Sequence, residues 1–550
     1  MEDKNNGKEM LNDTEISLSY KNKVINLIFI IGFTLLLITF FFIINLNFNK
    51  NKKDEKNIIF KISKNNNEIY ETGGEEKCLE SNLINYSFKA TYLTNSDNEN
   101  ISLIDPSFVD NIIEIKLDNE TIPVTYRYNF TNKGSHTLYF LMNISSINSL
   151  SCMFYGIENL ITISFSSEFN TENVTEISSM FSNCLLLHSI DILNLNLKNV
   201  IEMSGLFFGC STLKSIDLSN LDTQNLKDMS NMFGYCESLT FINFTNFNSK
   251  NVLYMNNLFE GCSSLESIDL SDLNTQNVEK MNNMFYGCSK LYSIKLSNFN
   301  TEKVRDMSYM FYKCLSLTSL NLSQLNTINV INMNSMFFLC ESLTSLNLFN
   351  FNTQNVEDMG DMLNGLHSLQ YLNISSFNTK NVINMGGMFS NILYITSLDV
   401  SNFDTHNVRN MAQMFSFCSS LKKLNVSNFN TGSATTMDSM FYFCTSLEEI
   451  DVSNFNTSNV GNMKTMFSHC KSLKEIDLSN FNTCSLGLFD LLLGECYNLH
   501  KIDVSSFYIS SNDLIIDGLI DDRGVIIINE YSKDAIKKQV PKDWMILVQK

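Results

Sequence analysis

Eleven of the 14 cysteines recur at intervals that are all multiples of 26 residues, and this spacing constrains the fold more than any other feature of the sequence. Leu366 and Ile392 occupy the two positions of the series that lack a cysteine, so thirteen units follow one another without an insertion. An imperfect unit precedes them, with Ile157 at the cysteine position. Such strict periodicity predicts a solenoid. The cysteines of the series are Cys184, Cys210, Cys236, Cys262, Cys288, Cys314, Cys340, Cys418, Cys444, Cys470 and Cys496.

The unit that begins at Val278 shows the internal pattern of the repeat. Val278, Met281, Met284, Phe285 and Cys288 are spaced at i, i+3, i+6, i+7 and i+10. This spacing places all five side chains on one face of an α-helix. We therefore expect one short helix in every unit.

A short strand is expected after the helix of each unit. Ile294 and Leu296 alternate with Ser293, Lys295 and Ser297, so the apolar side chains point inward and the polar ones outward. One unit is too small to be stable alone, and stacking must bury its apolar face against the next unit. The expected fold class is α/β: a leucine-rich-repeat-like solenoid with one short parallel strand and one helix per 26-residue unit.

A phenylalanine closes many of the units and is expected inside the solenoid. Phe299 occupies this place in the unit described above. Equivalent rings in successive units would stack as an aromatic spine along the interior. The counterparts of Phe299 are Phe247, Phe351, Phe377, Phe403, Phe429, Phe455 and Phe481.

Three roles compete for the cysteines of the series: disulfide pairing, metal or redox chemistry, and core packing. Disulfides between neighbours would leave one cysteine of the first unbroken run of seven unpaired, and Leu366 and Ile392 cannot form them. A thiolate metal site tolerates those two residues even less. Leu206 and Leu258 likewise replace methionines, which argues against a copper site. We therefore interpret the cysteines as free, buried thiols that pack as small apolar groups.

Residues 24–46 form an uncharged apolar run that is long enough to cross a bilayer as a helix. The run is longer than the core of a signal peptide and no small-residue cleavage pattern follows it, which favours a retained signal anchor. Lysines flank it on both sides, so charge does not decide its orientation. Residues 1–23 then form a short tail, and residues 47–77, rich in Asn, Lys and Glu, a flexible stalk.

Two segments without the repeat are expected to cap the solenoid, which fills residues 150–507. Residues 78–149 have the pattern of antiparallel strands joined by "DN" and "NKG" turns, which predicts a β-rich N-terminal cap. Cys78 and Cys152 are candidates for a disulfide in this cap. Residues 508–550 contain short apolar runs around a "DRG" turn, which predicts strands that cap the other end.

The unit "LESIDLSDLNTQNVEKMNNMFYGCSS" resembles the repeats of the BspA-like leucine-rich-repeat family, found in surface proteins of bacteria, mycoplasmas and protists. The resemblance covers residues 150–507. It implies a solenoid displayed outside the cell, with roles in adhesion or host contact, and it implies no catalytic residue. It also implies the orientation of the anchor, with residues 1–23 in the cytosol and the solenoid extracellular.

Composition and motifs narrow the chemistry further. A net charge of −19 argues against a nucleic-acid partner, because phosphate binding needs clustered Lys and Arg. The sequence contains no phosphate loop, GxGxxG, HExxH, GxSxG or paired CxxC motif, and its histidines share no ligand spacing. Asp217 and Asp269 belong to a strand position that we interpret as a solvated face, with weak calcium binding as the alternative. We assign no catalytic residue, cofactor or metal site.

Three functional hypotheses remain open at the level of the sequence. The favoured one is a single-pass cell-membrane protein whose extracellular solenoid recognises a protein or glycan ligand, with a role in adhesion or cell contact. The second is an intracellular scaffold tethered to a membrane with the opposite orientation. The third is an enzyme whose site lies in the β-unit at 78–149, although that unit offers no recognisable pair of nucleophile and base.

Outward strand positions are nearly always Ser, Asp or Asn, so large or cationic residues at these positions are candidate ligand contacts. Exposed aromatic side chains on a polar sheet are common anchors of interfaces. We predict that a ligand contacts the stretch around Phe349 and Tyr371, in adjacent units. The full candidate set is Phe241, Lys295, Phe349, Tyr371 and Lys423.

Overall fold

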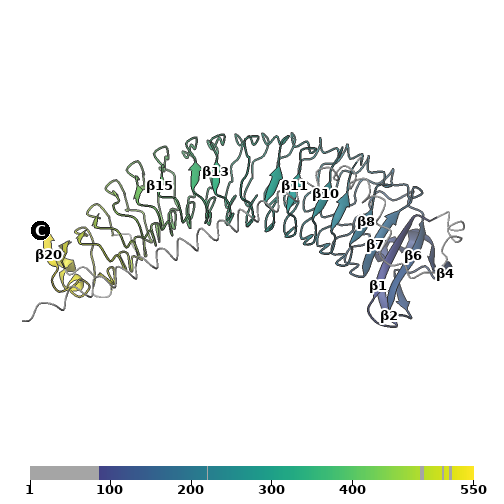
Figure 1. Ribbon diagram of the computed structural model, residues 1–550, viewed down its shortest axis with the longest axis horizontal. Helices are drawn as coiled ribbons and strands as arrows, with labels where there is room; N and C mark the ends of the chain where they lie inside the picture. The colour runs from purple at the N-terminus through teal and green to yellow at the C-terminus, as the bar shows by residue number, and fades with distance from the viewer. Residues whose placement is uncertain (1–85, 220, 484–487, 511–512, 520–522, 550) are drawn as a thin grey trace, which may run out of the picture. The chain divides into compact units, whose positions relative to one another are not determined.

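The structure is a computed structural model that describes residues 86–219, 221–483, 488–510, 513–519 and 523–549. The predicted tail, transmembrane segment and stalk, at 1–23, 24–46 and 47–77, lie outside these residues. In the described ranges, no helix is both long and apolar enough to cross a membrane. The described residues form a stack of similar coils that follows a small sheet of longer strands (Figure 1).

Antiparallel strands precede the coils. β1 (Phe88–Thr94) lies between β6 (Gly134–Met142) and β7 (Leu160–Phe165) in a sheet of order β4-β3-β6-β1-β7-β8. β7 pairs in parallel with β8 (Ser189–Asp191), the first strand of the coils. The sheet therefore continues into the solenoid and covers the edge of its first coil. The other elements of this part are β2 (Glu99–Ser102), η2 (Pro106–Asn111), β3 (Ile112–Leu117), β4 (Glu120–Ile122) and β5 (Arg127–Phe130).

Two parallel ladders join successive coils. The first consists of short strands whose residues pair with residues 26 positions away, such as Ile268 with Ile294. The second consists of isolated bridges that continue from coil to coil between Ser149 and Leu488. The strands are β9 (Ser215–Asp217), β10 (Phe241–Asn243), β11 (Ser267–Asp269), β12 (Ser293–Lys295), β13 (Ser345–Asn347), β14 (Tyr371–Asn373), β15 (Ser397–Leu398), β16 (Lys423–Leu424), β17 (Glu475–Asp477) and β18 (Lys501–Asp503).

The predicted helix in each unit is wrong. Met281, Phe285 and Cys288 are fully buried as expected, but the backbone that carries them is a series of turns. Asn283 and Gly287 have positive φ angles of 56° and 72°, and equivalent residues do so in the other coils. A left-handed residue every four positions prevents the i to i−4 bonding of an α-helix. Among the described residues, only η2, η3 and α3 are helical.

Backbone hydrogen bonds in these turns point to the next coil. The N–H groups of Asn283, Phe285 and Gly287 donate to carbonyls 25 residues later, at 2.9, 2.9 and 2.7 Å. Every second N–H group in these turns therefore donates to a carbonyl of the next coil. The N–H groups between them bond locally, as Cys288 N does to Phe285 O at 3.1 Å. A chain that turns every four residues also buries positions i, i+3, i+4 and i+7, which is why the spacing imitated a helix.

Two phenylalanine columns run through the interior, and the more closely stacked one is not the column that was predicted. Phe285 and its equivalents stack face to face, and the rings of Phe285 and Phe311 have centroids 5.7 Å apart and planes at 5°. This column is interrupted where Leu363 takes the phenylalanine position. In the predicted column, Phe299 is buried between coils that carry leucine at this place, but the counterparts from Phe351 onward are consecutive and stack in part, as Phe377 does on Phe403 with centroids 6.5 Å apart.

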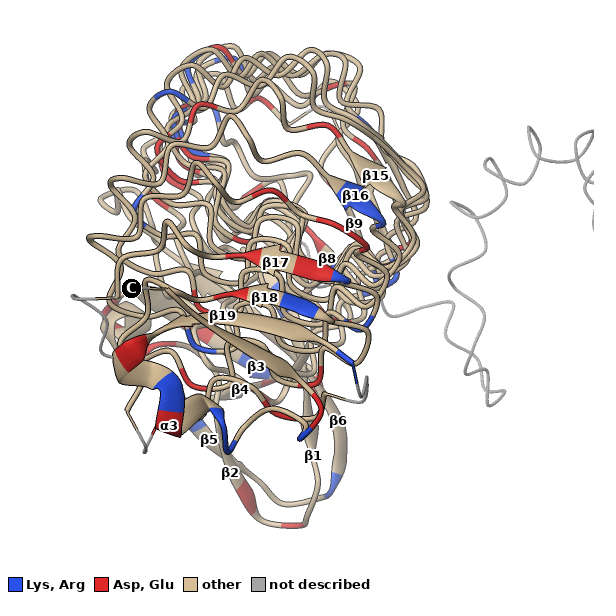
Figure 2. Ribbon diagram, turned by 90° about the vertical axis from the view of Figure 1, so that its left-hand side faces the viewer, with Lys and Arg blue, Asp and Glu red and all other residues tan. Residues whose placement is uncertain are grey.

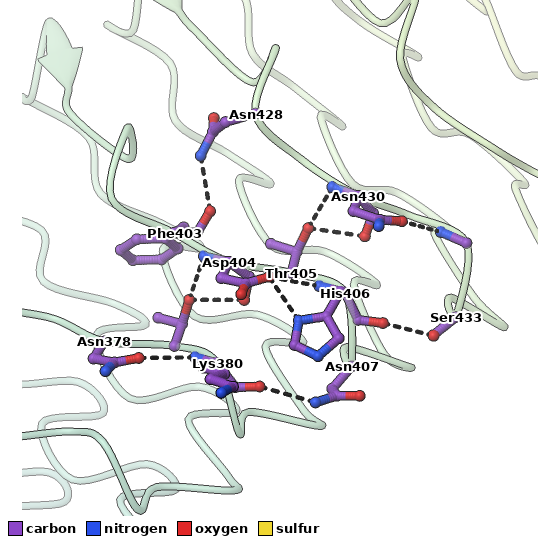
Figure 3. Close-up of polar contacts among 12 residues, drawn as sticks. Asn378, Lys380, Phe403, Asp404, Thr405, His406, Asn407, Asn428, Asn430 and Ser433 are labelled. Carbon is purple, nitrogen blue, oxygen red and sulfur yellow. Dashed lines mark hydrogen bonds and ion pairs between the residues drawn. The ribbon is translucent and has the colours of Figure 1, made fainter.

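Buried threonines form a second column inside the coils (Figure 3). The Thr405 hydroxyl donates to the carbonyl of Asn430 at 2.9 Å and accepts from the N–H of the same residue at 2.8 Å. The Asn407 side-chain amide donates to the Lys380 carbonyl at 2.9 Å in the preceding coil. These bonds satisfy backbone groups that stacking removes from water. The buried threonines of the column are Thr171, Thr223, Thr275, Thr301, Thr327, Thr353, Thr379, Thr405, Thr431 and Thr457, with Ser249 in one coil.

The eleven cysteines of the series are free and buried, as the interpretation of the sequence expected. The Cys288 thiol donates to the Phe259 carbonyl at 3.1 Å, and the same bond recurs along the column. Burial raises the pKa of these thiols, to about 12 for Cys340. A thiol of this kind is neither a nucleophile nor a metal ligand at neutral pH, since both roles require the thiolate.

We expect the eleven thiols to resist alkylation in the folded protein at pH 7 and also at pH 9, because both burial and the raised pKa suppress the thiolate. Iodoacetamide labelling followed by peptide mass mapping measures each cysteine separately. After denaturation without reductant, all eleven should become labelled. Labelling of Cys288 in the native state, or a disulfide between neighbouring members such as Cys288 and Cys314, would contradict this assignment.

Strands also close the C-terminal end of the stack. β18 pairs in parallel with β19 (Val525–Asn529), which pairs with β20 (Met545–Gln549). Ile526 and Ile528 of β19 are fully buried, so this strand extends the core beyond the last repeat. Between β19 and β20 lie the short helices η3 (Glu530–Ser532) and α3 (Lys533–Ile536).

Candidate recognition surface

The short strands do not form one continuous sheet. β9 pairs with β10, β11 with β12, β13 with β14 and β15 with β16, and β17 begins a separate sheet that runs to β20. We call the unpaired position between two such groups an open junction, and the outward surface of the strands the strand face. Paired parallel strands stay about 4.8 Å apart, whereas nothing of this kind holds the coils at an open junction. The coils are therefore joined continuously along the bridges and only at intervals on the strand face.

Grooves on the strand face lie at these open junctions. One of about 440 Å³ separates β14 from β15. A second, of about 670 Å³, extends along the strand positions from Lys423 to Ile527 and includes the junction before β17. A third, much smaller hollow lies between Asn321 and Asn347. The groove between β14 and β15 thus lies at an interruption in strand pairing, whereas the second groove also runs over the paired strands β17 and β18. A further hollow of about 680 Å³, lined by Arg305 and Glu357, lies beside the continuous bridges.

Ion pairs between adjacent coils line the second groove. Figure 2 shows the resulting mixture of acidic and basic segments in β16, β17 and β18. All six side chains are well exposed, and such pairs contribute only about 0–1 kcal/mol each in water. The residues that line the groove include six acidic and three basic side chains, so its net charge is negative. The pairs are Lys423 with Glu449 at 2.7 Å, Lys474 with Glu448 at 3.7 Å and Lys501 with Glu475 at 2.9 Å.

The candidate contact residues lie on or beside the strand face. Phe241, Tyr371 and Lys423 are the first residues of β10, β14 and β16, and Lys295 is the last residue of β12. Phe349 was expected at a strand position, but it lies in the turn two residues after β13. Phe349 and Tyr371 are in adjacent, paired coils, at places four residues apart in the repeat, so they are not direct neighbours across the strands.

The two candidate lysines are already engaged by the protein. The Lys295 ammonium lies 2.9 Å from the Asp269 carboxylate, and Lys423 lies 2.7 Å from Glu449. The Ser271 hydroxyl and then Lys295 lower the pKa of Asp269 to about 2, so this carboxylate is charged at any physiological pH. A ligand that used either lysine would first have to displace its partner. The aromatic candidates are therefore the stronger anchors.

The three aromatic candidates are exposed to a degree that is unusual for such residues. Phe241, Phe349 and Tyr371 have 60%, 59% and 55% of their surface accessible. Their neighbours at outward strand positions are mainly Ser, Asn and Asp. Large apolar groups on a polar surface mark interaction sites more often than small ones do.

A family of known proteins shares this repeat. The model of the family described as "Mycoplasma protein of unknown function, DUF285" matches residues 132–242, 201–319, 236–345, 315–423, 337–447 and 393–507. These overlapping matches cover more than half of the chain, from residue 132 to residue 507. The chain belongs to the DUF285 family. A comparison with curated proteins finds no match.

The solved structures that a structural comparison matches to this DUF285 chain share little sequence with it. A complex of TLR13 with ssRNA13 is 14% identical over 71% of this chain and 79% of that chain, with a TM-score of 0.20. The pneumococcal vaccine antigen PcpA is 14% identical over 68% and 79%, also with a TM-score of 0.20. The functional domain of InlJ from Listeria monocytogenes, which includes a cysteine ladder, is 13% identical over 74% and 75%, with a TM-score of 0.17. At these TM-scores the likeness carries no argument about function.

The sequence prediction did not include Tyr394 and Tyr292, two exposed aromatic residues beside the DUF285 strands. Tyr394 is 62% exposed and lines the groove between β14 and β15 together with Tyr371. It stands three residues before β15, at a turn position that carries Lys290 and Ser368 in other coils. The predicted ligand contacts were large or cationic residues at outward strand positions, and Tyr394 lies at a turn position. A comparison of the turn positions would have found Tyr394.

Two further predictions about sites stay open. Cys152 lies in the described residues and is exposed, but Cys78, its candidate disulfide partner, lies outside them. In the described part of the chain, no group of three or more His, Cys, Asp or Glu side chains is placed to hold a metal ion. The hypotheses of an enzyme in the β-unit and of an intracellular scaffold are tested by nothing in this geometry.

Proposed function

We propose that this protein recognises a protein or glycan partner through its strand face. One observation carries the proposal: the large aromatic side chains of Phe241, Phe349 and Tyr371 stand exposed on or beside a polar strand ladder, and a groove lies next to Tyr371. Anchoring aromatic groups beside concave polar surfaces are what recognition sites require. The rest of the coil interior is occupied by packing and by hydrogen bonds between coils, which leaves the outward surface to carry function.

We further propose that the solenoid is extracellular and anchored to the cell membrane by residues 24–46. The uncharged run of these residues supports an anchor, and the resemblance of the 26-residue units to BspA-like surface repeats supports the orientation. Adhesion or contact with a host or neighbouring cell is the role that this arrangement serves. Nucleic acid is not a partner of such a protein, because its net charge is −19.

The proposed location has a direct test. Protease added to intact cells that express the full chain should shed the solenoid and leave a short anchored fragment. The same treatment after permeabilisation is the control for protease access. A solenoid that is cleaved only after permeabilisation would place it inside the cell and support the scaffold hypothesis.

Recognition itself is tested with the full-length chain in nanodiscs, applied to protein and glycan arrays. Replacing Phe349 and Tyr371 together by serine should weaken the binding of an array hit by tenfold or more, because both side chains are exposed anchors. Tyr155→Ser is the matched control, since Tyr155 is 52% exposed but lies in a turn outside the strand face. Equal loss in the control, or no loss in the double variant, would remove the strand face as the binding surface.

A further inference from the structure

The coil that contains Ile392 departs from the regular repeat. In the coils on either side, Leu369 N donates to Leu366 O at 3.1 Å and Leu421 N to Cys418 O at 3.2 Å, which closes a turn before the strand. Ile395, the equivalent residue, makes no such bond within the described part of the chain. The turn is open in this coil, and it carries Tyr394 on the surface.

The open turn coincides with an open junction. β14 pairs with β13 on one side but not with β15 on the other, and the groove of about 440 Å³ lies at this unpaired side. Tyr371 of β14 and Tyr394 of the next coil both line it. The volume lies within the range of about 300–1,000 Å³ that is usual for sites of small ligands.

Both tyrosine rings are available to a ligand. Tyr371 and Tyr394 are 55% and 62% exposed, and within the described residues neither ring contacts another aromatic ring. Other surface tyrosines differ: the rings of Tyr286 and Tyr312 stack on each other with centroids 4.5 Å apart. The face of an aromatic ring carries partial negative charge, so a ring face that no second ring covers presents this charge to a ligand.

The groove also holds polar groups that the protein leaves unused. At some paired junctions an outward residue bonds its counterpart in the neighbouring strand, as Asn243 does to Asp217 at 3.0 Å. Asn373 and Asp399 border the open junction, and within the described residues their side chains accept only local bonds, from Ser375 and Ser401. The Asn373 amide N–H groups have no acceptor among the described residues, so they and the Asp399 carboxylate can bond a ligand in the groove.

We propose that the groove between β14 and β15 binds a neutral oligosaccharide, with sugar rings lying against Tyr371 and Tyr394. The C–H groups on one face of a sugar carry partial positive charge and are attracted to the face of an aromatic ring. Sugar hydroxyls both donate and accept, so they match the free amide of Asn373 and carboxylate oxygen of Asp399. This inference deepens the proposed recognition function and rests on it.

The charge of the groove selects a neutral sugar over an anionic one. No Lys, Arg or His is among the residues that line it, and Asp399 is acidic. The hydroxyl of Ser401, followed by its backbone N–H, lowers the pKa of Asp399, so the carboxylate is ionised at neutral pH. Sulfated, phosphorylated or sialylated glycans would meet a negative charge with no cation to compensate for it.

The test uses the full-length chain in nanodiscs and a defined set of probes. The neutral probes are tetrasaccharides of β-linked glucose, α-linked glucose, β-linked galactose and N-acetylglucosamine, and the anionic probe is a heparin-derived hexasaccharide. We expect at least one neutral tetrasaccharide to bind by calorimetry and the anionic probe not to bind. Binding of the heparin probe alone, or of no probe, overturns the proposal.

Variants locate the site. Tyr371→Ala and Tyr394→Ala should each weaken the neutral probe at least tenfold, whereas Tyr371→Phe, which keeps the ring, should stay within about threefold. Tyr155→Ala is the matched control, because Tyr155 is 52% exposed but lies in a turn and does not line the groove. An unchanged melting temperature in each variant shows that the coils remain folded. Equal binding by wild type and both tyrosine variants overturns the proposal.

Failure of this inference can be told from failure of the proposed function. If a protein from the array binds and is lost in the Phe349 and Tyr371 double variant, while no neutral tetrasaccharide binds, recognition by the strand face stands and the sugar site falls. If neither the arrays nor the tetrasaccharides yield a ligand, both the proposed recognition function and the proposed sugar site are contradicted.

Discussion

Replacing Phe285 by alanine is expected to lower the free energy of unfolding by about 3–5 kcal/mol, the largest effect of any single side chain discussed for this solenoid. The ring is fully buried and is stacked on two others, with centroids 5.5 Å from Phe259 and 5.7 Å from Phe311. Its removal leaves a cavity in the middle of the stack that neighbouring coils cannot close. Urea denaturation followed by circular dichroism measures the change, and hydrogen exchange of residues 255–315 shows whether unfolding begins there.

The chain itself supplies the control for this prediction. Leu363 occupies the same position in another coil and is also fully buried. Phe285→Leu is therefore expected to cost only about 1 kcal/mol, since the volume is largely kept. If Phe285→Ala and Phe285→Leu had the same small effect, the stacked rings would not be a main source of stability.

Replacing Thr301 by valine is expected to lower the free energy of unfolding by about 2–4 kcal/mol, although the two side chains have nearly the same shape. The Thr301 hydroxyl donates to the Asn326 carbonyl at 2.8 Å and accepts from its N–H at 2.8 Å. Valine would leave both backbone groups without a partner in a buried position, and each such group costs about 1–3 kcal/mol. The same urea titration measures it.

Thr301→Ser separates the hydroxyl from the methyl group. Ser249 naturally occupies the equivalent position and bonds Asn274 in both directions, at 3.1 and 2.7 Å. Serine at 301 should therefore retain most of the stability and lose about 1 kcal/mol for the missing methyl. A loss in Thr301→Ser as large as in Thr301→Val would mean that packing of the methyl, and not hydrogen bonding, is what the column contributes.

The interior of the coils could be predicted residue by residue, but the backbone that carries it could not. Val278, Met281 and Cys288 were expected inside and are fully buried. The helix expected for them is absent because Asn283 and Gly287, in left-handed conformations, redirect every second N–H to the next coil. Asn and Gly tolerate such angles, but Tyr309, Lys313 and Phe417 hold equivalent places in other coils, so residue type alone does not reveal the left-handed positions.

The candidate recognition surface was predictable in part. Phe241, Phe349 and Tyr371 are large residues at positions where the repeat has small polar ones, and the structure places all three at the surface. The engagement of Lys295 by Asp269 was not foreseen, because it depends on strand register between coils. Tyr394 is a candidate contact because it lines a groove, and no local sequence pattern predicts that groove.

By itself, the sequence determined the coil length, the unbroken register and the set of buried residues, because an apolar side chain that recurs every 26 positions can be buried only if equivalent positions stack. The tertiary structure decided which coils bond through their strands and which stand apart. Strand pairing requires neighbouring strands to lie in register at hydrogen-bonding distance, and this depends on how two whole coils pack against each other. The open junctions, and the groove between β14 and β15, therefore belong to the stack and not to any single repeat.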